Sequence, residues 1–172
     1  SNNKIDNELY SKYDVKKGLR NEDGTGVLVG LTKIADVVGY KRVENKKVDC
    51  EGELYYRGIN VSDIINKREP HQRFLFEETC FLILFGYLPT VEELENFKKE
   101  LSDRYELPPH YLESKILGFP SKNLMNKLQQ EVLMLYSYDD DPDNISASST
   151  MYKGLNLIAK IPSIVCYAYR SK

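Results

Sequence analysis

The sequence of 172 residues contains no tryptophan, two histidines and three cysteines. Cys50, Cys80 and Cys166 form no CxxC pair, and their odd number does not suit a disulfide framework, so a reducing, cytoplasmic setting is expected. Apolar runs are short as well, and none approaches the roughly 18 residues that suggest a membrane-spanning helix. The composition therefore argues against a disulfide-stapled secreted domain, and no membrane segment is predicted.

Neither sign of charge is in large excess. Lys and Arg number 24 and Asp and Glu number 26, which gives a formal net charge of -2. A nucleic-acid partner bound through bulk positive charge is therefore not expected. Hydrophobic residues make up 41% of the chain, including thirteen Tyr and six Phe, which argues against a disordered acidic segment. A chain of this length forms one domain, or part of a larger one, with a buried core.

The sequence lacks the motifs that usually mark nucleotide-binding or catalytic sites. Gly24, Gly26 and Gly30 superficially match a dinucleotide-binding turn, but they precede a β-branched stretch instead of following a strand and opening a helix. The chain contains no GxxxxGK[ST] phosphate loop and no GxSxG nucleophile elbow. No catalytic, cofactor-binding or metal-binding residue is predicted, and no cofactor is expected.

The cysteines and histidines have plain structural interpretations. Cys50 lies between two acidic residues, which disfavour a reactive thiolate. Cys80 and Cys166 fall in apolar helical stretches, where a packing role is expected. His71 lies in a polar loop and His110 follows two prolines near a helix start, so neither is expected to act as a general base.

The amino-terminal third is predicted to hold a short helix and one strand pair. Apolar residues in the segment 1–15 are spaced for one short helical face. Apolar and β-branched residues at 27–38 and the segment 53–57 predict antiparallel strands. The mixed charges between them predict a solvated loop over 40–52.

From residue 60 onward the apolar spacing becomes helical. Asn60 opens a predicted helix that ends near residue 67, and Gly86 is the stop signal of an apolar helix over 74–85. Thr90 and Glu93 form a capping-box pattern for the following helix. Further helices are predicted over 111–117, 124–138 and 147–169. The predicted fold class is therefore mainly α with a small antiparallel strand pair.

The last two predicted helices are unusually apolar. The segment 124–138 carries a broad apolar face, and Pro162 predicts a kink within 147–169. That last helix has two apolar rows, made by Leu155, Ile158, Ala159, Pro162, Cys166 and Tyr169 and by Leu157, Ile161 and Val165. Such surfaces need cover on more than one side, either in a larger core or in a subunit contact. Burial at the second row predicts that Ile161→Asp or Val165→Asp is strongly destabilising.

Four aspartates and Pro142 lie between the last two predicted helices, in the segment 139–143. Their spacing lacks the alternating ligand positions and the glycine of an EF-hand loop, so metal binding is not expected. The segment is predicted to be a polar turn in which Asp143 or Asn144 helps to cap the last helix.

Four sequence blocks follow one another in an informative order. They are LTKI with GELYYRG at 31–34 and 52–58, FEETCFLILFGYLPT at 76–90, EEL with FKK at 92–99, and LIAKIPSIV with YAYR at 157–170. Together they resemble the citrate synthase family over residues 16–172. The stretch 40–52 and the segment from Gly18 to Arg20 resemble the clostridial-type branch of that family.

The resemblance implies a fold and a function. It implies a segment 1–15 with a short helix, and a partial, mainly helical large domain over 16–172 that ends before the catalytic half. The family condenses acetyl-CoA with oxaloacetate and water to citrate and CoA, or propionyl-CoA in its 2-methylcitrate synthase relatives. Its carboxylate base and two histidines lie in the carboxy-terminal half, so this stretch is expected to be inactive alone.

The resemblance also implies a homodimer through 124–138 and 147–169, with small-molecule substrates in the whole protein. One departure is that Asn123-Leu124-Met125 stands where many members have His-Pro-Met, which is expected to alter the start of a helix. The residues taken alone also fit a helical interaction module without catalysis.

Overall fold

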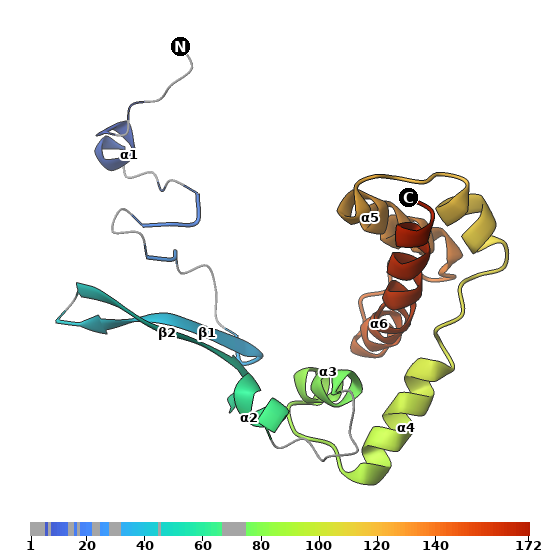
Figure 1. Cartoon of the computed structure of the whole chain (residues 1–172), viewed down its shortest axis with the longest axis horizontal. Helices are drawn as coiled ribbons and strands as arrows, with labels where there is room; N and C mark the ends of the chain where they lie inside the picture. Colours follow the sequence, from blue (N-terminus) through green and yellow to red (C-terminus); the bar gives the residue numbers. More distant parts are fainter. Residues whose placement is uncertain are drawn as a thin grey trace. The chain divides into compact units, whose positions relative to one another are not determined.

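The computed structural model describes residues 6, 8–13, 16, 18–21, 25–27, 32–44, 46–66 and 75–172. The chain divides into two compact units, residues 1–88 and residues 89–172 (Figure 1). Six α-helices and a three-stranded antiparallel sheet lie within the described residues, which confirms a mainly α fold. The predicted division at residue 15, between an amino-terminal segment and the family's large domain, stays a prediction.

The sheet of the first unit is a long hairpin with a short third strand. β1 (Ala35–Val43) pairs with β2 (Lys46–Tyr56), and β2 pairs with β3 (Ile59–Asn60). The predicted loop over 40–52 is therefore wrong, because most of those residues belong to the two strands. Their charged side chains are exposed, so the ribbon carries them into water without burying charge.

The rest of the first unit follows the predicted order. The predicted amino-terminal helix is present as α1 (Glu8–Lys12). Among the described residues between α1 and β1, Arg20 and Gly26 form an isolated antiparallel bridge. The start of the strand predicted at 27–38 falls partly on residues 28–31, which lie outside the described residues, as do Gly24 and Gly30.

Two short helices complete this unit, and local signals set their ends. The side-chain oxygen of Asn60 accepts from the backbone N–H of Ser62 at 2.8 Å, which confirms it as the opening of α2 (Val61–Asn66). Gly86 ends α3 (Phe76–Phe85) with a φ of 88°, a left-handed conformation that glycine adopts at low cost. Arg57 then fixes α3, since its guanidinium donates twice to the carbonyl oxygen of Ile83.

The second unit opens with a fully formed capping box. In α4 (Val91–Ser102) the Thr90 hydroxyl accepts from the backbone N–H of Glu93, and the Glu93 carboxylate accepts from the backbone N–H of Thr90. This confirms the sequence prediction. Phe97 and Leu101 are buried from the same helix.

The short helix predicted at 111–117 is present, but its type was not predicted. Segment η1 (Leu112–Leu117) is a π-helix, in which the backbone N–H of Gly118 donates to the carbonyl oxygen of Glu113, five residues back. It packs on the core of the unit, which is formed by Tyr111, Ile116, Ile164 and Ala168.

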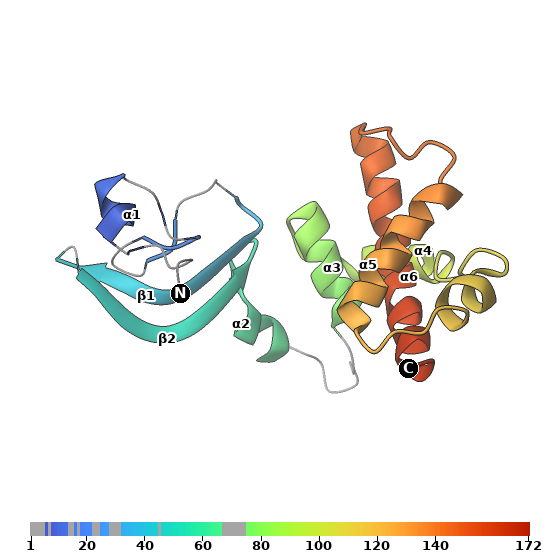
Figure 2. The ribbon, with the colours of Figure 1, turned by 90° about the horizontal axis from the view of Figure 1, so that it is seen from above.

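Two helices finish the unit and contact one another (Figure 2). They are α5 (Leu124–Leu135), prolonged by the 3-10 turn η2 (Tyr136–Tyr138), and α6 (Ala147–Arg170). Helix α6 continues through Pro162, and a kink there stays a prediction. Neither of these helices, nor any other that the structure describes, is long and apolar enough to cross a membrane.

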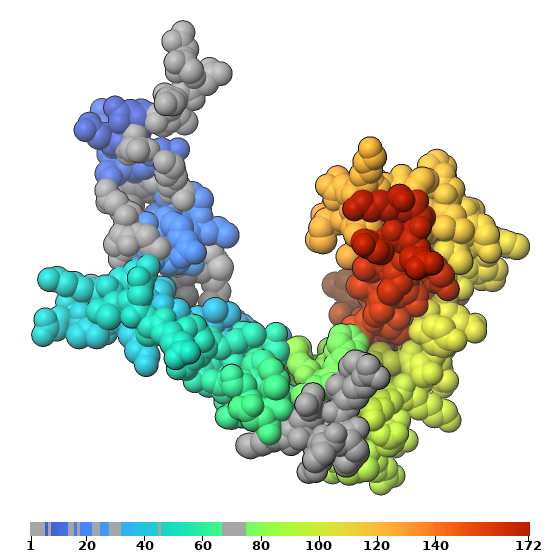
Figure 3. Space-filling model, viewed as in Figure 1, coloured from blue at the N-terminus to red at the C-terminus, as the bar shows by residue number. Residues whose placement is uncertain are grey.

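The fully buried residues of α6 are Ile164 and Ala168, which belong to neither predicted row. Ile164 and Ala168 are 0% and 3% exposed, whereas Val165 and Tyr169 are 38% and 62% exposed. The sequence prediction left open whether a larger core or a subunit contact covers the two rows, and Leu155, Leu157 and Ile158 are half-buried within this chain. The burial predicted for Val165→Asp is absent within this chain. Figure 3 shows the end of α6, in red, at the surface.

Candidate functional site

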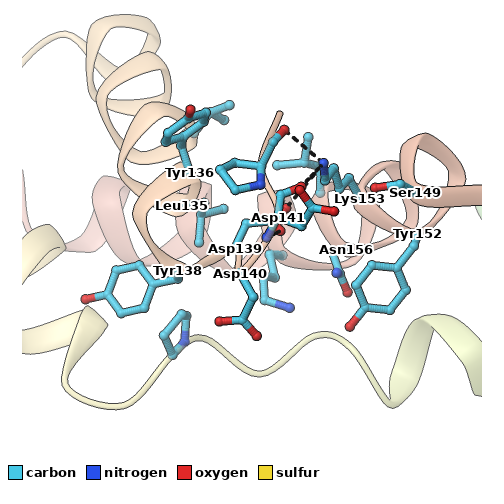
Figure 4. A pocket seen from close by; sticks show the side chains of 15 residues that line it. Leu135, Tyr136, Tyr138, Asp139, Asp140, Asp141, Ser149, Tyr152, Lys153 and Asn156 are labelled. Atoms are coloured by element: carbon cyan, nitrogen blue, oxygen red, sulfur yellow. Dashed lines mark hydrogen bonds and ion pairs between the residues drawn. The ribbon is translucent and has the colours of Figure 1, made fainter. Parts of the chain in front are cut away.

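The carboxy-terminal unit contains a cleft with a volume of about 570 Å³. Its walls come from the end of α5, from η2 and the Asp-rich loop after it, and from the first half of α6 (Figure 4). Many of the lining side chains are aromatic or polar, and they include Tyr136, Tyr138, Asp139, Asp140, Asp141, Tyr152, Lys153, Asn156 and Lys160.

Lys160 supplies one of the two ammonium groups in the lining. Its Nζ donates to the backbone oxygen of Arg104 at 2.7 Å, which ties α6 to the segment after α4. Burial lowers the pKa of Lys160, and the positive charge of Arg104 lowers it further. Arg104 lies over the Tyr152 ring, with its guanidinium carbon 5.6 Å from the ring centre. Arg104, which is not itself a lining residue, therefore adds positive charge near Lys160.

Lys153 supplies the second ammonium group. Its Nζ donates to the backbone oxygens of Asp141 at 2.6 Å and of Pro142 at 2.8 Å. A third bond of 3.0 Å goes to the backbone oxygen of Asn144, and the Asp139 carboxylate is 3.9 Å away. Each of the three N–H groups of this ammonium therefore has a backbone acceptor.

The Asp-rich turn caps α6 differently from the prediction. The N-cap is Ser146, whose hydroxyl accepts from the backbone N–H of Ser149. Asn144 lies two residues before this N-cap, and its side-chain oxygen accepts from the Ser146 N–H at 2.9 Å. Asp143 instead accepts from the Tyr136 hydroxyl at 2.8 Å. The prediction placed the cap too early, because the capping residue directly precedes the first helical residue.

No group of three or more His, Cys, Asp or Glu side chains is arranged to hold a metal ion within the described ranges. In the Asp-rich loop, carboxylates bond to the loop's own donors. Asp139 accepts from the backbone N–H of Asp141 at 2.9 Å, and Asp141 accepts from the Asn144 side chain at 2.9 Å. These contacts are typical of turns stabilised by Asx side chains.

A buried ion pair lies on the inner face of α5. Lys127 Nζ is 2.7 Å from Glu131 Oε1, and the two side chains are only 2% and 3% exposed. Lys127 also donates to the backbone oxygen of Lys115 in the π-helix at 2.7 Å. The Tyr111 hydroxyl donates to the backbone oxygen of Glu131 at 2.7 Å. This network joins α5 to η1 through polar contacts inside the core.

This pair was not predicted from the sequence, although a signal for it was present. Lys127 and Glu131 fall between Leu124, Leu128 and Leu135 at helical spacings of three and four. Charged residues at two positions of an otherwise apolar face, four residues apart, fit an internal ion pair. Their role here is structural: they connect two helices, and neither lines the cleft.

The three cysteines are not brought together. Cys80 is half-buried in α3, where burial raises the pKa of its thiol and the nearby charge of Glu77 raises it further. That environment disfavours a thiolate and agrees with packing. Cys50 is half-buried on β2. Cys166 is exposed, so the predicted packing role is wrong for it within this chain. It lies on a different side of α6 from the buried Ile164.

His110 does not line the cleft. His110 is exposed before η1 with a φ of 60°, and its backbone oxygen accepts from the hydroxyl and the N–H of Ser114. It is therefore placed as a loop residue at a helix start, as predicted. His71 lies outside the described residues.

Asn123 has a defined structural role at the start of α5. Its side-chain oxygen accepts from the backbone N–H of Asn126 at 3.0 Å, so Asn123 is the N-cap and the helix begins at Leu124. Side-chain capping accounts for an asparagine at this position.

The outer sides of α5 and α6 expose apolar side chains. On α5, Met125 and Leu133 are 67% and 74% exposed. On α6, Tyr167 and Tyr169 are 43% and 62% exposed. Apolar side chains therefore remain exposed on both helices.

Comparison with known proteins shows similarity to the citrate synthase family. Residues 20–172 match the family described as "Citrate synthase, C-terminal domain". The chain is 30% identical over 159 residues to the citrate synthase of Saccharolobus solfataricus, covering 92% of this chain and 36% of the relative. It is 29% identical over 163 residues to 2-methylcitrate synthase 1 of Corynebacterium glutamicum, covering 94% and 37%. The crystal structure of citrate synthase from Pyrobaculum aerophilum superposes with a TM-score of 0.64 at 28% identity, covering 85% of this chain and 35% of that one.

Proposed function

Because the chain belongs to the citrate synthase family, we propose that the whole protein condenses acetyl-CoA with oxaloacetate and water to give citrate and free CoA. The observation that carries this proposal is the family match over residues 20–172. The chain spans a little over a third of the length of these relatives, namely 36% of the Saccharolobus enzyme. The activity is therefore proposed for the whole protein.

We propose that this part of the protein is a scaffold and is inactive alone. The resemblance to the family implies that the carboxylate base and the two histidines lie in the carboxy-terminal half of the whole protein. In that scheme the base removes a proton from the acetyl-CoA methyl group, and the histidines assist at the enol and at the oxaloacetate carbonyl. His110 is exposed at a helix start, which supports a structural reading of this segment.

The scaffold role agrees with the contacts of the second unit. Lys127 and Glu131 join α5 to η1, and Lys160 joins α6 to the segment after α4. Such contacts hold helices in fixed positions, which an enzyme needs when its reacting groups come from other segments.

We propose that the whole protein is a homodimer through 124–138 and 147–169. The support is the exposure of Met125 and Leu133 on α5 and of Tyr169 on α6. Light scattering of the whole protein should give twice the chain mass. A clean monomer at all concentrations would refute this interface. A cytoplasmic location also stays a prediction.

A second candidate function is 2-methylcitrate synthesis from propionyl-CoA. It is favoured by the 29% identity to the Corynebacterium 2-methylcitrate synthase over 94% of this chain. The two reactions share oxaloacetate and differ by one methylene in the acyl group, so discrimination depends on the acyl pocket.

The deciding experiment measures the release of CoA thiol by the full-length protein with oxaloacetate and either acyl-CoA. Faster release with acetyl-CoA supports citrate synthase, and faster release with propionyl-CoA supports the second candidate. No release with either from a folded protein would overturn both proposals and favour a non-catalytic helical interaction module. The 172-residue chain serves as the control, and thiol release by it would overturn the proposed scaffold role.

A further inference from the structure

The Asp-rich loop between η2 and α6 surrounds one ammonium group. Lys153, in the second turn of α6, directs its Nζ back toward the loop (Figure 4). The backbone oxygens of Asp141, Pro142 and Asn144 lie 2.6, 2.8 and 3.0 Å from it. The carboxylate of Asp139 adds negative charge at 3.9 Å. Backbone oxygens that converge in this way are the ligands by which proteins bind potassium in place of its water shell.

We propose that this loop is a monovalent-cation site whose resident cation is the ammonium of Lys153. Ammonium and potassium ions are similar in size and both are bound by carbonyl oxygens. An ammonium tethered to α6 can therefore occupy a site that a free ion would otherwise fill. Charge supports the assignment, because four aspartates in the segment 139–143 would repel one another without a cation among them.

The position of the site gives Lys153 a positioning role. The loop forms one wall of the cleft, and Asn144 bonds both to the Lys153 ammonium and to the capping residue Ser146. The ammonium thus fixes the loop against the helix that follows it. This role is independent of catalysis by the whole protein, so its test does not depend on the proposed function.

The test is chemical rescue of Lys153→Ala in the 172-residue chain. Loss of three charge-assisted hydrogen bonds should lower Tm by about 5–10 °C. Ammonium or potassium chloride should restore at least half of that loss, while tetramethylammonium chloride at equal ionic strength should not, because that ion is too large for the site. Lys122→Ala, at an exposed lysine of the same unit, is the matched control and should show neither effect. An unchanged Tm, or equal recovery in all three salts, would overturn the proposal.

A measurement on the unaltered chain covers the case in which Lys153→Ala does not fold. An ammonium with three acceptors exchanges its protons slowly with water. The 15N-labelled chain should therefore give a side-chain ammonium signal for Lys153 at neutral pH, assigned through its side-chain carbons, and none for Lys122. Equally fast exchange at both lysines would overturn the proposal.

Discussion

The buried pair of Lys127 and Glu131 allows a stability prediction with a built-in contrast. Their charged atoms are 2.7 Å apart, and the side chains are 2% and 3% exposed. Lys127→Met keeps the length of the side chain but removes the charge, which leaves the Glu131 carboxylate buried without its partner. Breaking a buried pair in this way costs about 3–5 kcal/mol. That is a large share of the roughly 5–15 kcal/mol by which domains are stable.

The double variant Lys127→Met with Glu131→Leu should behave differently. It removes both charges and fills the space with apolar groups, and such replacements are often neutral or stabilising by about 1–4 kcal/mol. One oxygen of Glu131 has no hydrogen-bond partner among the described residues, which increases the benefit of removing that carboxylate. The double variant is therefore expected to be far more stable than Lys127→Met.

Urea unfolding followed by circular dichroism measures these free energies. The matched control is Lys98→Met, because Lys98 and Glu95 also lie 2.8 Å apart but are 43% and 65% exposed. An exposed pair of this kind is worth about 0–1 kcal/mol. If Lys127→Met costs no more than Lys98→Met, the burial argument fails. A double variant as unstable as the single one would show that the network is needed for packing, not for charge balance.

Three further predictions concern one capping residue, one buried tyrosine and one buried isoleucine. Thr90→Ala removes the capping box and should lower the free energy of unfolding by about 1 kcal/mol, measured by urea titration. Burial raises the pKa of Tyr111 above its ordinary 10.0, so above pH 10 the unfolded chain loses a proton that the folded chain keeps, and stability falls. Tyr111→Phe should remove that part of the alkaline loss, and an unchanged pH slope would contradict this. Ile164→Asp should destabilise strongly and Val165→Asp much less in the same chain, since the side chains are 0% and 38% exposed; equal melting temperatures would count against this assignment.

Features that depend on neighbouring residues were predictable from the sequence. The bonds between Thr90 and Glu93 span three residues, and the bond from Ser62 to Asn60 spans two. Gly86 ends α3 through its own backbone conformation. Each of these involves groups that are close in any helical conformation, so the residue types and their spacing are sufficient.

Features that depend on an exposed environment were ambiguous. The charged residues over 40–52 suit a solvated loop as well as an exposed hairpin, because water surrounds the side chains in both. Backbone pairing between β1 and β2 decided between the two. The sequence also did not predict that η1 is a π-helix. In the structure, the Lys127 ammonium donates to the carbonyl oxygen of Lys115 within that segment.

The sequence and the tertiary structure decided different features of this protein. By itself the sequence determined the mainly α class, the order of the helices, most of their ends and the resemblance to a family. Only the tertiary structure decided that Ile164 and not Val165 faces the core, and that Lys153 joins the carbonyl oxygens of a loop. The physical reason is that a helix with apolar residues on several sides, or a long charged side chain, has several comparable local environments. Packing against distant segments selects one of them.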